Sequence, residues 1–173
     1  VLVTDGHEPL LGLTAADFEV LDNGVAQKVD LAAFQRLPLN VVLALDTSGS
    51  VTGARLESLR EASRAIVGDL KQGDRVALLT FSNVLSVRAD LSGEVERVRA
   101  ALDDLPVSGD TALVDATYTA IVTGESGSGR ALVIVLSDGV DTASFLRPES
   151  VLETARRSDV VVYGVSVSRL ERT

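Results

Sequence analysis

Four short runs of almost uninterrupted apolar residues alternate with amphipathic segments, and this alternation constrains the fold more than any other feature of the chain. The runs are residues 40–45 (NVVLAL), 76–81 (VALLTF), 131–136 (ALVIVL) and 160–167 (VVVYGVSV). A strand that is apolar at every position must be buried on both faces, as happens when helices cover both sides of a parallel sheet. These short runs, rich in β-branched residues, therefore predict the buried strands of an α/β domain.

The segments between the runs complete this pattern. Apolar residues at three- and four-residue spacing predict helices at residues 55–70, 94–105, 112–122 and 148–157. Residues 84–89 follow the second strand after only Ser82 and Asn83, a link too short for a parallel crossover, so this strand should pair antiparallel at the sheet edge. We therefore expect an α/β fold with a doubly wound, Rossmann-like, mostly parallel sheet that has one antiparallel edge strand.

The beginning of the chain is different in character. Residues 1–38 predict a small β-rich lead-in segment, and residues 39–173 predict the α/β domain. Within the lead-in, residues 1–3 predict a short strand, and Thr14 is placed to cap a single helical turn. Asn23-Gly24 is the preferred pair for a tight turn, which predicts a hairpin from the strands on either side of it. Further along, residues 124–129 (GESGSG) predict a flexible loop.

Charge and composition exclude several kinds of partner. Acidic residues outnumber basic ones by 25 to 16, for a net charge of −9, and no basic run is present. This balance argues against binding to nucleic acid or to an anionic membrane surface. The chain has no cysteine, which excludes disulfides and thiolate metal sites. No apolar run approaches the roughly 20 residues that a membrane-spanning helix needs.

Oxygen-bearing side chains follow two of the predicted buried strands. Asp46 ends the first strand and is followed by Ser48 and Ser50, while Asp138 holds the same position after the third strand. Thr111 precedes the helix expected from residue 112. Ligands of open α/β sheets collect outside the carboxyl ends of the strands, where the chain order reverses, so these side chains should share one rim. Carboxylate and hydroxyl oxygens suit Mg²⁺ or Mn²⁺ and suit zinc or copper poorly.

Three motifs together resemble the von Willebrand factor A domain and its metal-ion-dependent adhesion site. They are DxSxS at residues 46–50, GDTAL at 109–113 and LSDG at 136–139, in the order that the family has them. The resemblance runs from about residue 40 to the end. The lead-in is similar to that of bacterial proteins related to this family. The family usually continues with another strand and helix, so the C-terminal part of the domain is expected to be missing here.

The resemblance implies a role for each residue of the site. Ser48 and Ser50 would ligate the ion directly, and Thr111 would ligate it directly or through water. Asp46 and Asp138 would act largely through water. The remaining coordination position would be left for an Asp or Glu of a partner protein, and the location would be extracytoplasmic, that is secreted, periplasmic or on a surface.

These expectations describe a metal-dependent protein-binding module and not an enzyme, and two alternatives stay open. The first is a phosphoryl-transfer domain that uses the strand-tip Asp46. It lacks the late lysine of receiver domains, because the only lysines are Lys28 and Lys71. The second is a structural or assembly domain that works without metal. No catalytic residue is predicted, since nothing places His7, the only histidine, beside a serine as a catalytic triad requires.

Overall fold

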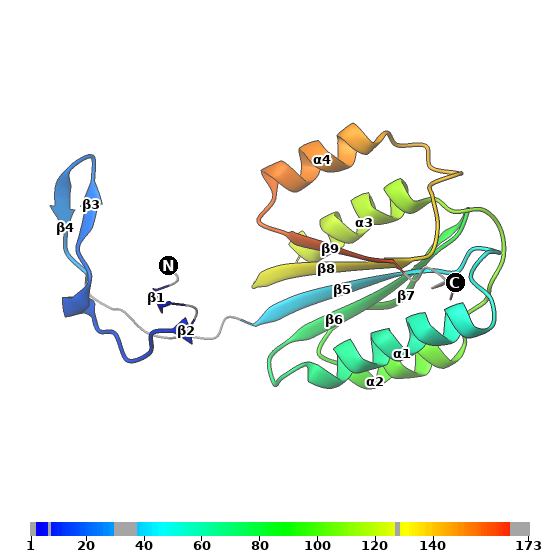
Figure 1. Ribbon diagram of the computed structural model, residues 1–173, viewed down its shortest axis with the longest axis horizontal. Coiled ribbons are helices and arrows are strands. Elements are labelled where there is room, and N and C mark those ends of the chain that lie inside the picture. Colours follow the sequence, from blue (N-terminus) through cyan, green and yellow to red (C-terminus); the bar gives the residue numbers. More distant parts are fainter. Residues whose placement is uncertain (1–2, 7, 30–37, 127–128, 167–173) are drawn as a thin grey trace. The chain divides into compact units, whose positions relative to one another are not determined.

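The structure is a computed structural model, and it describes residues 3–6, 8–29, 38–126 and 129–166 (Figure 1). The chain forms two compact units, Val1–Leu37 and Pro38–Thr173.

The described residues of the first unit form two small antiparallel pairs and one helical turn. Strand β1 (Thr4–Asp5) pairs with β2 (Glu8–Pro9), and β3 (Val20–Asp22) pairs with β4 (Val25–Gln27). The hairpin expected around Asn23-Gly24 is confirmed, with both residues at positive φ, 48° and 82°. The strand expected at residues 1–3 is described only at Val3, which is not part of a strand. Val3 precedes β1, whose pairing closes around the turn at Gly6, and residues 1–2 lie outside the described part of the chain.

Thr14 precedes a single 3₁₀ turn, Ala15–Asp17, as expected. The Asp17 carboxylate accepts a hydrogen bond from the backbone N–H of Thr14 at 2.7 Å and another from its hydroxyl at 2.8 Å. Both bonds favour the charged carboxylate, the backbone bond more strongly, and they hold the pKa of Asp17 below its ordinary value.

The second unit is built on a five-stranded sheet (Figure 1). The order is β7-β6-β5-β8-β9, and every neighbouring pair is parallel except β6 with β7. This arrangement confirms the expected fold class, including the antiparallel edge strand. The strands are β5 (Leu39–Asp46), β6 (Arg75–Phe81), β7 (Leu85–Ser92), β8 (Arg130–Ser137) and β9 (Val161–Ser166).

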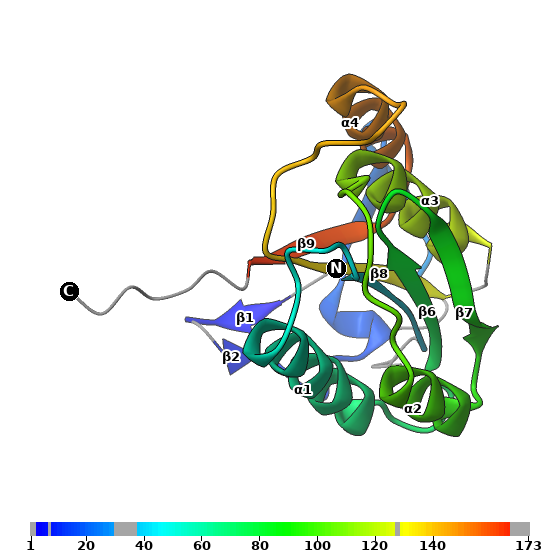
Figure 2. The same ribbon diagram turned by 90° about the vertical axis from the view of Figure 1, so that its right-hand side faces the viewer.

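Helices cover both faces of this sheet (Figures 1 and 2). Helices α1 (Ala54–Asp69) and α2 (Val95–Asp103) lie on one face, and α3 (Leu113–Glu125) and α4 (Pro148–Arg157) lie on the other. Alternate residues of β5 therefore enter separate cores: Leu43 packs in the core under α1 and α2, and Ala44 packs in the core under α3. Burial on both faces explains why the strand sequences are apolar at every position.

Helix α3 is longer than the sequence pattern indicates. The expected helix covers residues 112–122, yet α3 continues to Glu125, so the expected loop begins later than residue 124. Gly124 is buried inside the helix, where an added Cβ would lie 3.2 Å from the Cβ of Ala131. The glycine allows close approach of α3 to β8, and this packing offsets its low helix propensity.

The chain order reverses between β5 and β8. From β5 the chain continues to β6 on one side, whereas β8 and β9 lie on the other side. Within the described strands, β9 forms the outer edge, and its residues are exposed. No helix in the described part of the chain has the length and apolar character to cross a membrane.

Candidate metal centre

The first loop of the site follows β5 and is fixed by backbone contacts on both sides. The N–H of Thr47 donates to the Phe81 carbonyl at 2.7 Å, and the Thr47 carbonyl accepts from Ser108 N–H at 3.0 Å. The N–H of Gly49 donates to the Gly109 carbonyl at 2.8 Å. These bonds tie the loop to the end of β6 and to the loop before α3, so its hydroxyls have a defined position.

The second loop brings Thr111 to the same rim. Its backbone passes close to Asn83 at Gly109, where an added Cβ would lie 2.0 Å from Asn83 Oδ1 and where φ is +81°. Only glycine fits this combination of space and backbone conformation. Thr111 itself is buried, and its backbone N–H donates to the Thr142 hydroxyl at 3.0 Å. The second loop is therefore joined to the third loop, which follows β8.

The third loop is anchored to the N-terminus of α3. The Ser144 hydroxyl accepts hydrogen bonds from the N–H groups of Val114 and Asp115, both at 3.1 Å, and Asp141 accepts a further bond from Val114 at 3.2 Å. In return, the Asp115 carboxylate accepts bonds from the backbone N–H groups of Phe145 and Leu146. Two of the first N–H donors of α3 are thus satisfied by the loop that carries Asp138.

Removing the Ser144 hydroxyl should destabilise the protein, because this hydroxyl accepts from two N–H groups at the start of α3 and only that of Val114 also donates to Asp141. We expect Ser144→Ala to cost about 1 kcal/mol, the usual cost of losing a helix cap. Ser58→Ala is the matched control: the Ser58 hydroxyl donates only to the Ala54 carbonyl one turn earlier in α1. Urea denaturation of both variants gives the comparison. An equal loss in the two would contradict the anchoring role of Ser144.

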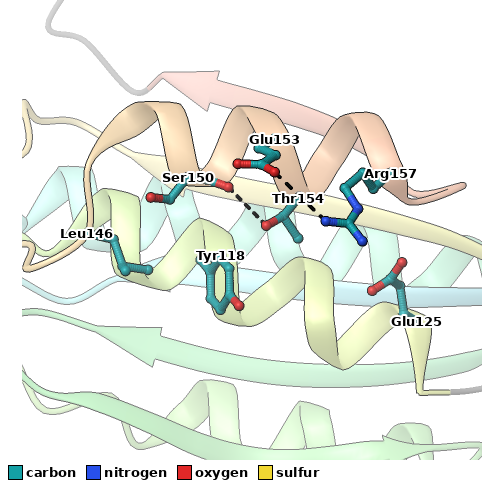
Figure 3. A pocket seen from close by; sticks show the side chains of 7 residues that line it. All are labelled: Tyr118, Glu125, Leu146, Ser150, Glu153, Thr154 and Arg157. Carbon is teal, nitrogen blue, oxygen red and sulfur yellow. Dashed lines mark hydrogen bonds and ion pairs between the residues drawn. The ribbon is translucent and has the colours of Figure 1, made fainter.

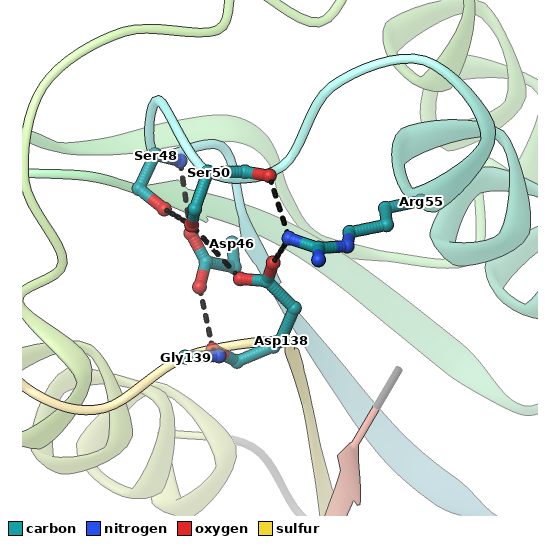
Figure 4. A network of polar contacts seen from close by, with 7 residues as sticks. Asp46, Ser48, Ser50, Arg55, Asp138 and Gly139 are labelled. Carbon is teal, nitrogen blue, oxygen red and sulfur yellow. Dashed lines mark hydrogen bonds and ion pairs between the residues drawn. The ribbon is translucent and has the colours of Figure 1, made fainter. Parts of the chain in front are cut away.

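Four of the five residues expected at the site form one chain of hydrogen bonds (Figure 4). Asp46 is fully buried and accepts from the Ser48 N–H at 2.8 Å through Oδ1 and from the Ser137 hydroxyl through Oδ2. The Ser48 and Ser50 hydroxyls lie 3.1 Å apart, and Ser50 donates to Asp138 Oδ1 at 2.9 Å. Residues from two strand ends, 88 positions apart in the case of Ser50 and Asp138, therefore meet on one rim.

Thr111, the fifth expected residue, lies near these hydrogen-bonded residues, on the other side of Gly139. An added Cβ at Gly139 would lie 3.7 Å from Thr111 Oγ1 and 3.9 Å from Asp46 Oδ2. Gly139 leaves this space open, and its N–H donates to the Ser137 hydroxyl at 3.1 Å. The structure thus brings all five expected residues to the rim where the chain order reverses.

A surface depression of about 470 Å³ is lined by Ser48, Ser50 and Thr111, the three hydroxyl residues among the five. Several of its lining residues come from each of the three loops, so all three loops border the depression. The lining residues are Ser48, Gly49, Ser50, Gly109, Asp110, Thr111, Gly139, Val140 and Thr142.

The donor set fits a hard divalent cation. The described residues contain no cluster of three or more His, Cys, Asp or Glu side chains that could hold a metal ion. The candidate site therefore differs from metal sites built entirely from those four residue types. It offers instead two carboxylates and three hydroxyls, which is the oxygen chemistry that Mg²⁺ or Mn²⁺ prefers. A cationic group already lies against these oxygens: Arg55 Nη1 is 2.6 Å from Asp138 Oδ2. The site therefore accommodates positive charge.

Sequence reasoning missed three residues that support the site. Ser137 and Thr142 hydrogen-bond to Asp46 and Thr111, and Arg55 pairs with Asp138. One signal for Arg55 was present, since a basic residue in the first turn of a helix opposes the helix dipole and indicates a nearby carboxylate. His7 lies outside the described residues.

A second hollow, of about 560 Å³, lies between α3 and α4, away from the residues expected at the site (Figure 3). Its polar groups bond largely within α4, where Thr154 donates to the Ser150 carbonyl at 2.9 Å and Arg157 lies 3.8 Å from Glu153. Tyr118 and Glu125 of α3 face it from the other side. It contains none of the residues predicted from the sequence.

A doubly wound sheet of this order, with carboxylate and hydroxyl side chains gathered where the chain order reverses, defines a Rossmann-like α/β domain. Residues 40–173 match the model of the von Willebrand factor type A domain, and the chain belongs to this family. Domains of this family typically serve in adhesion and protein interaction.

Individual relatives agree with this assignment. The chain is 29% identical over 133 residues to inter-alpha-trypsin inhibitor heavy chain H4 of Sus scrofa, covering 70% of this chain and 14% of that protein. It thus spans about a seventh of that relative's length. Its fold is similar to von Willebrand factor type A from Catenulispora acidiphila, with a TM-score of 0.63 and 18% identity. The match covers 78% of this chain and 34% of that one. Its fold is also similar to the vWF domain of the type V pili tip protein Mfa5 from Porphyromonas gingivalis, with a TM-score of 0.56 and 22% identity. This match covers 61% of this chain and 39% of that one.

Proposed function

We propose that this chain is a protein-interaction module that holds a divalent cation, Mg²⁺ or Mn²⁺, and binds a partner protein through a carboxylate of that partner. The observation that carries the proposal is that three hydroxyl residues line one open depression while two carboxylates, Asp46 and Asp138, hydrogen-bond to the serines among them. Family membership supports it, since the three segments that supply these residues lie within the matched region.

Each residue has a distinct part in this proposal. Ser48, Ser50 and Thr111 offer neutral oxygens to the ion, while Asp46 and Asp138 supply the negative charge around it. When bound, the ion supplies a positive centre whose charge is only partly cancelled, and this attracts an Asp or Glu side chain. Because Asp46 is buried and accepts two hydrogen bonds, it also holds the loop that presents the hydroxyls.

The phosphoryl-transfer alternative has less support. Both oxygens of Asp46 are engaged within the protein, and its side chain is fully buried, so attack on a phosphate donor would require the loop to open. Lys71 follows α1 before β6, at the opposite end of the strands from Asp46, and Lys28 belongs to the first unit. Mass spectrometry after incubation with acetyl phosphate tests this alternative, and a stable adduct on Asp46 would favour it over our proposal.

An extracytoplasmic location is part of the same proposal. The support for it is that one of the structural relatives is described as a type V pili tip protein. Two of the three named relatives are described as an inhibitor heavy chain and a pili tip protein, which fits a binding role without catalysis.

A random peptide library displayed on phage tests the proposal without knowledge of the natural partner. Selection against the protein in millimolar Mg²⁺ should enrich peptides that contain Asp or Glu, and EDTA should release them, because both the ion and the carboxylate are needed. Changing the acidic residue of a selected peptide to its amide should abolish binding. Peptides that stay bound in EDTA would instead support an assembly domain that works without metal.

A further inference from the structure

Arg55 joins two of the residues that are proposed to surround the ion. It lies in the first turn of α1, and its Nη1 donates to Asp138 Oδ2 at 2.6 Å and to the Ser50 carbonyl at 3.1 Å (Figure 4). The Asp138 side chain is only 4% exposed, whereas that of Arg55 is 41% exposed. Arg55 therefore reaches from the surface to a shielded carboxylate.

The position of Arg55 in α1 is unfavourable by itself. A helix N-terminus carries partial positive charge, so a cation in the first turn is repelled unless a carboxylate lies beside it. Asp138 is that carboxylate. The next basic residues of α1 behave differently, since Arg60 and Arg64 pair with Glu57, and Arg64 also pairs with Asp103, along the side of the helix.

We propose that Arg55 is an internal cation that competes with the metal ion for Asp138 and so sets the metal affinity of the site. This inference rests on the proposed function. Without metal, the guanidinium neutralises a carboxylate that is nearly excluded from water. With metal, the same positive charge repels the ion and weakens its binding.

This arrangement couples metal binding to partner binding. A partner carboxylate adds negative charge at the site, which offsets the repulsion between Arg55 and the ion. The two ligands should therefore bind more tightly together than separately, and the coupling is reciprocal. An acidic partner segment would stabilise a metal-loaded state that the protein alone reaches only at higher metal concentration.

Removing the charge of Arg55 should have two effects of opposite sign. In Arg55→Met, the affinity for Mn²⁺ measured by calorimetry should rise roughly three- to tenfold, because one positive charge near the ion is gone. The melting temperature in EDTA should fall, because Asp138 loses its countercharge. A purely structural role would lower the melting temperature without tightening Mn²⁺ binding.

Two further variants and one control complete the experiment. Arg55→Gln can still donate a hydrogen bond to Asp138 without charge, so it should also bind Mn²⁺ more tightly and serves if Arg55→Met does not fold. Arg55→Lys keeps the charge and should stay within about twofold of wild type. Arg64→Met removes one positive charge elsewhere on α1 and should also stay within about twofold, because exposed charges at a distance are screened.

The outcomes separate this inference from the function on which it rests. Wild-type protein that binds Mn²⁺ while Arg55→Met and Arg55→Gln bind it equally or more weakly would overturn the role of Arg55 alone. If neither the wild type nor any Arg55 variant bound Mn²⁺, the proposed metal-dependent function would itself be overturned. Tight binding by Arg55→Met with weak binding by the wild type would support both.

Discussion

Mg²⁺ at about 100 times its dissociation constant should stabilise the wild-type protein by about 2.7 kcal/mol, and Asp46→Asn should abolish that stabilisation. At this chain length the stabilisation corresponds to roughly 5 to 10 °C in melting temperature. Asparagine removes the negative charge and keeps an oxygen that can accept from the Ser48 N–H, so the loop retains its main contact. Loss of metal binding would then reflect the charge and not a change of fold.

Asp159→Asn is the matched control for this experiment. Asp159 is exposed and precedes β9, so it lies at the amino end of the parallel strands, opposite to Asp46. Adding Mg²⁺ in place of EDTA should raise the melting temperature of Asp159→Asn as much as it raises that of the wild type. If Mg²⁺ raised the melting temperature of Asp46→Asn by the full wild-type amount, the ion would bind elsewhere. If Mg²⁺ did not raise the melting temperature of the wild type, the metal-independent alternative would be favoured.

The largest loss of stability is expected from Phe81→Ala, at about 3 to 5 kcal/mol. Phe81 is fully buried in the core under α3, where its removal leaves a cavity between the sheet and the helix. It also pairs with Asp46 across β5 and β6, and its carbonyl accepts the Thr47 N–H at 2.7 Å. A disturbance of this core would therefore reach the loop that carries Ser48 and Ser50.

Phe145→Ala provides a control with the same chemical change. Phe145 is 96% exposed in the loop before α4, so its truncation should alter the free energy of unfolding by no more than about 0.5 kcal/mol. Chemical denaturation at 25 °C measures both variants. A loss below about 1 kcal/mol for Phe81→Ala would contradict the tight packing of this core.

The fold class was predictable because its signals are local. Runs such as residues 40–45 and 131–136 are apolar at every position, and only burial on both faces of a sheet accommodates that pattern. The short link at Ser82-Asn83 likewise required the antiparallel edge pair that β6 and β7 form. Helix ends were less predictable, since the continuation of α3 through Gly124 depends on contact with Ala131 of a strand that comes later in the chain.

The candidate site likewise has a part that local sequence patterns predict and a part that they do not. Local sequence patterns were enough to predict the fold class and to place Asp46 and Asp138 at the ends of their strands. The 2.6 Å contact between Arg55 and Asp138, and the support that Thr142 gives to Thr111, could be seen only in the folded chain. Those pairs join residues 83 and 31 positions apart. Contacts of this kind form when loops that are far apart in the sequence pack together at one rim. Local sequence patterns therefore do not predict which side chains will meet there.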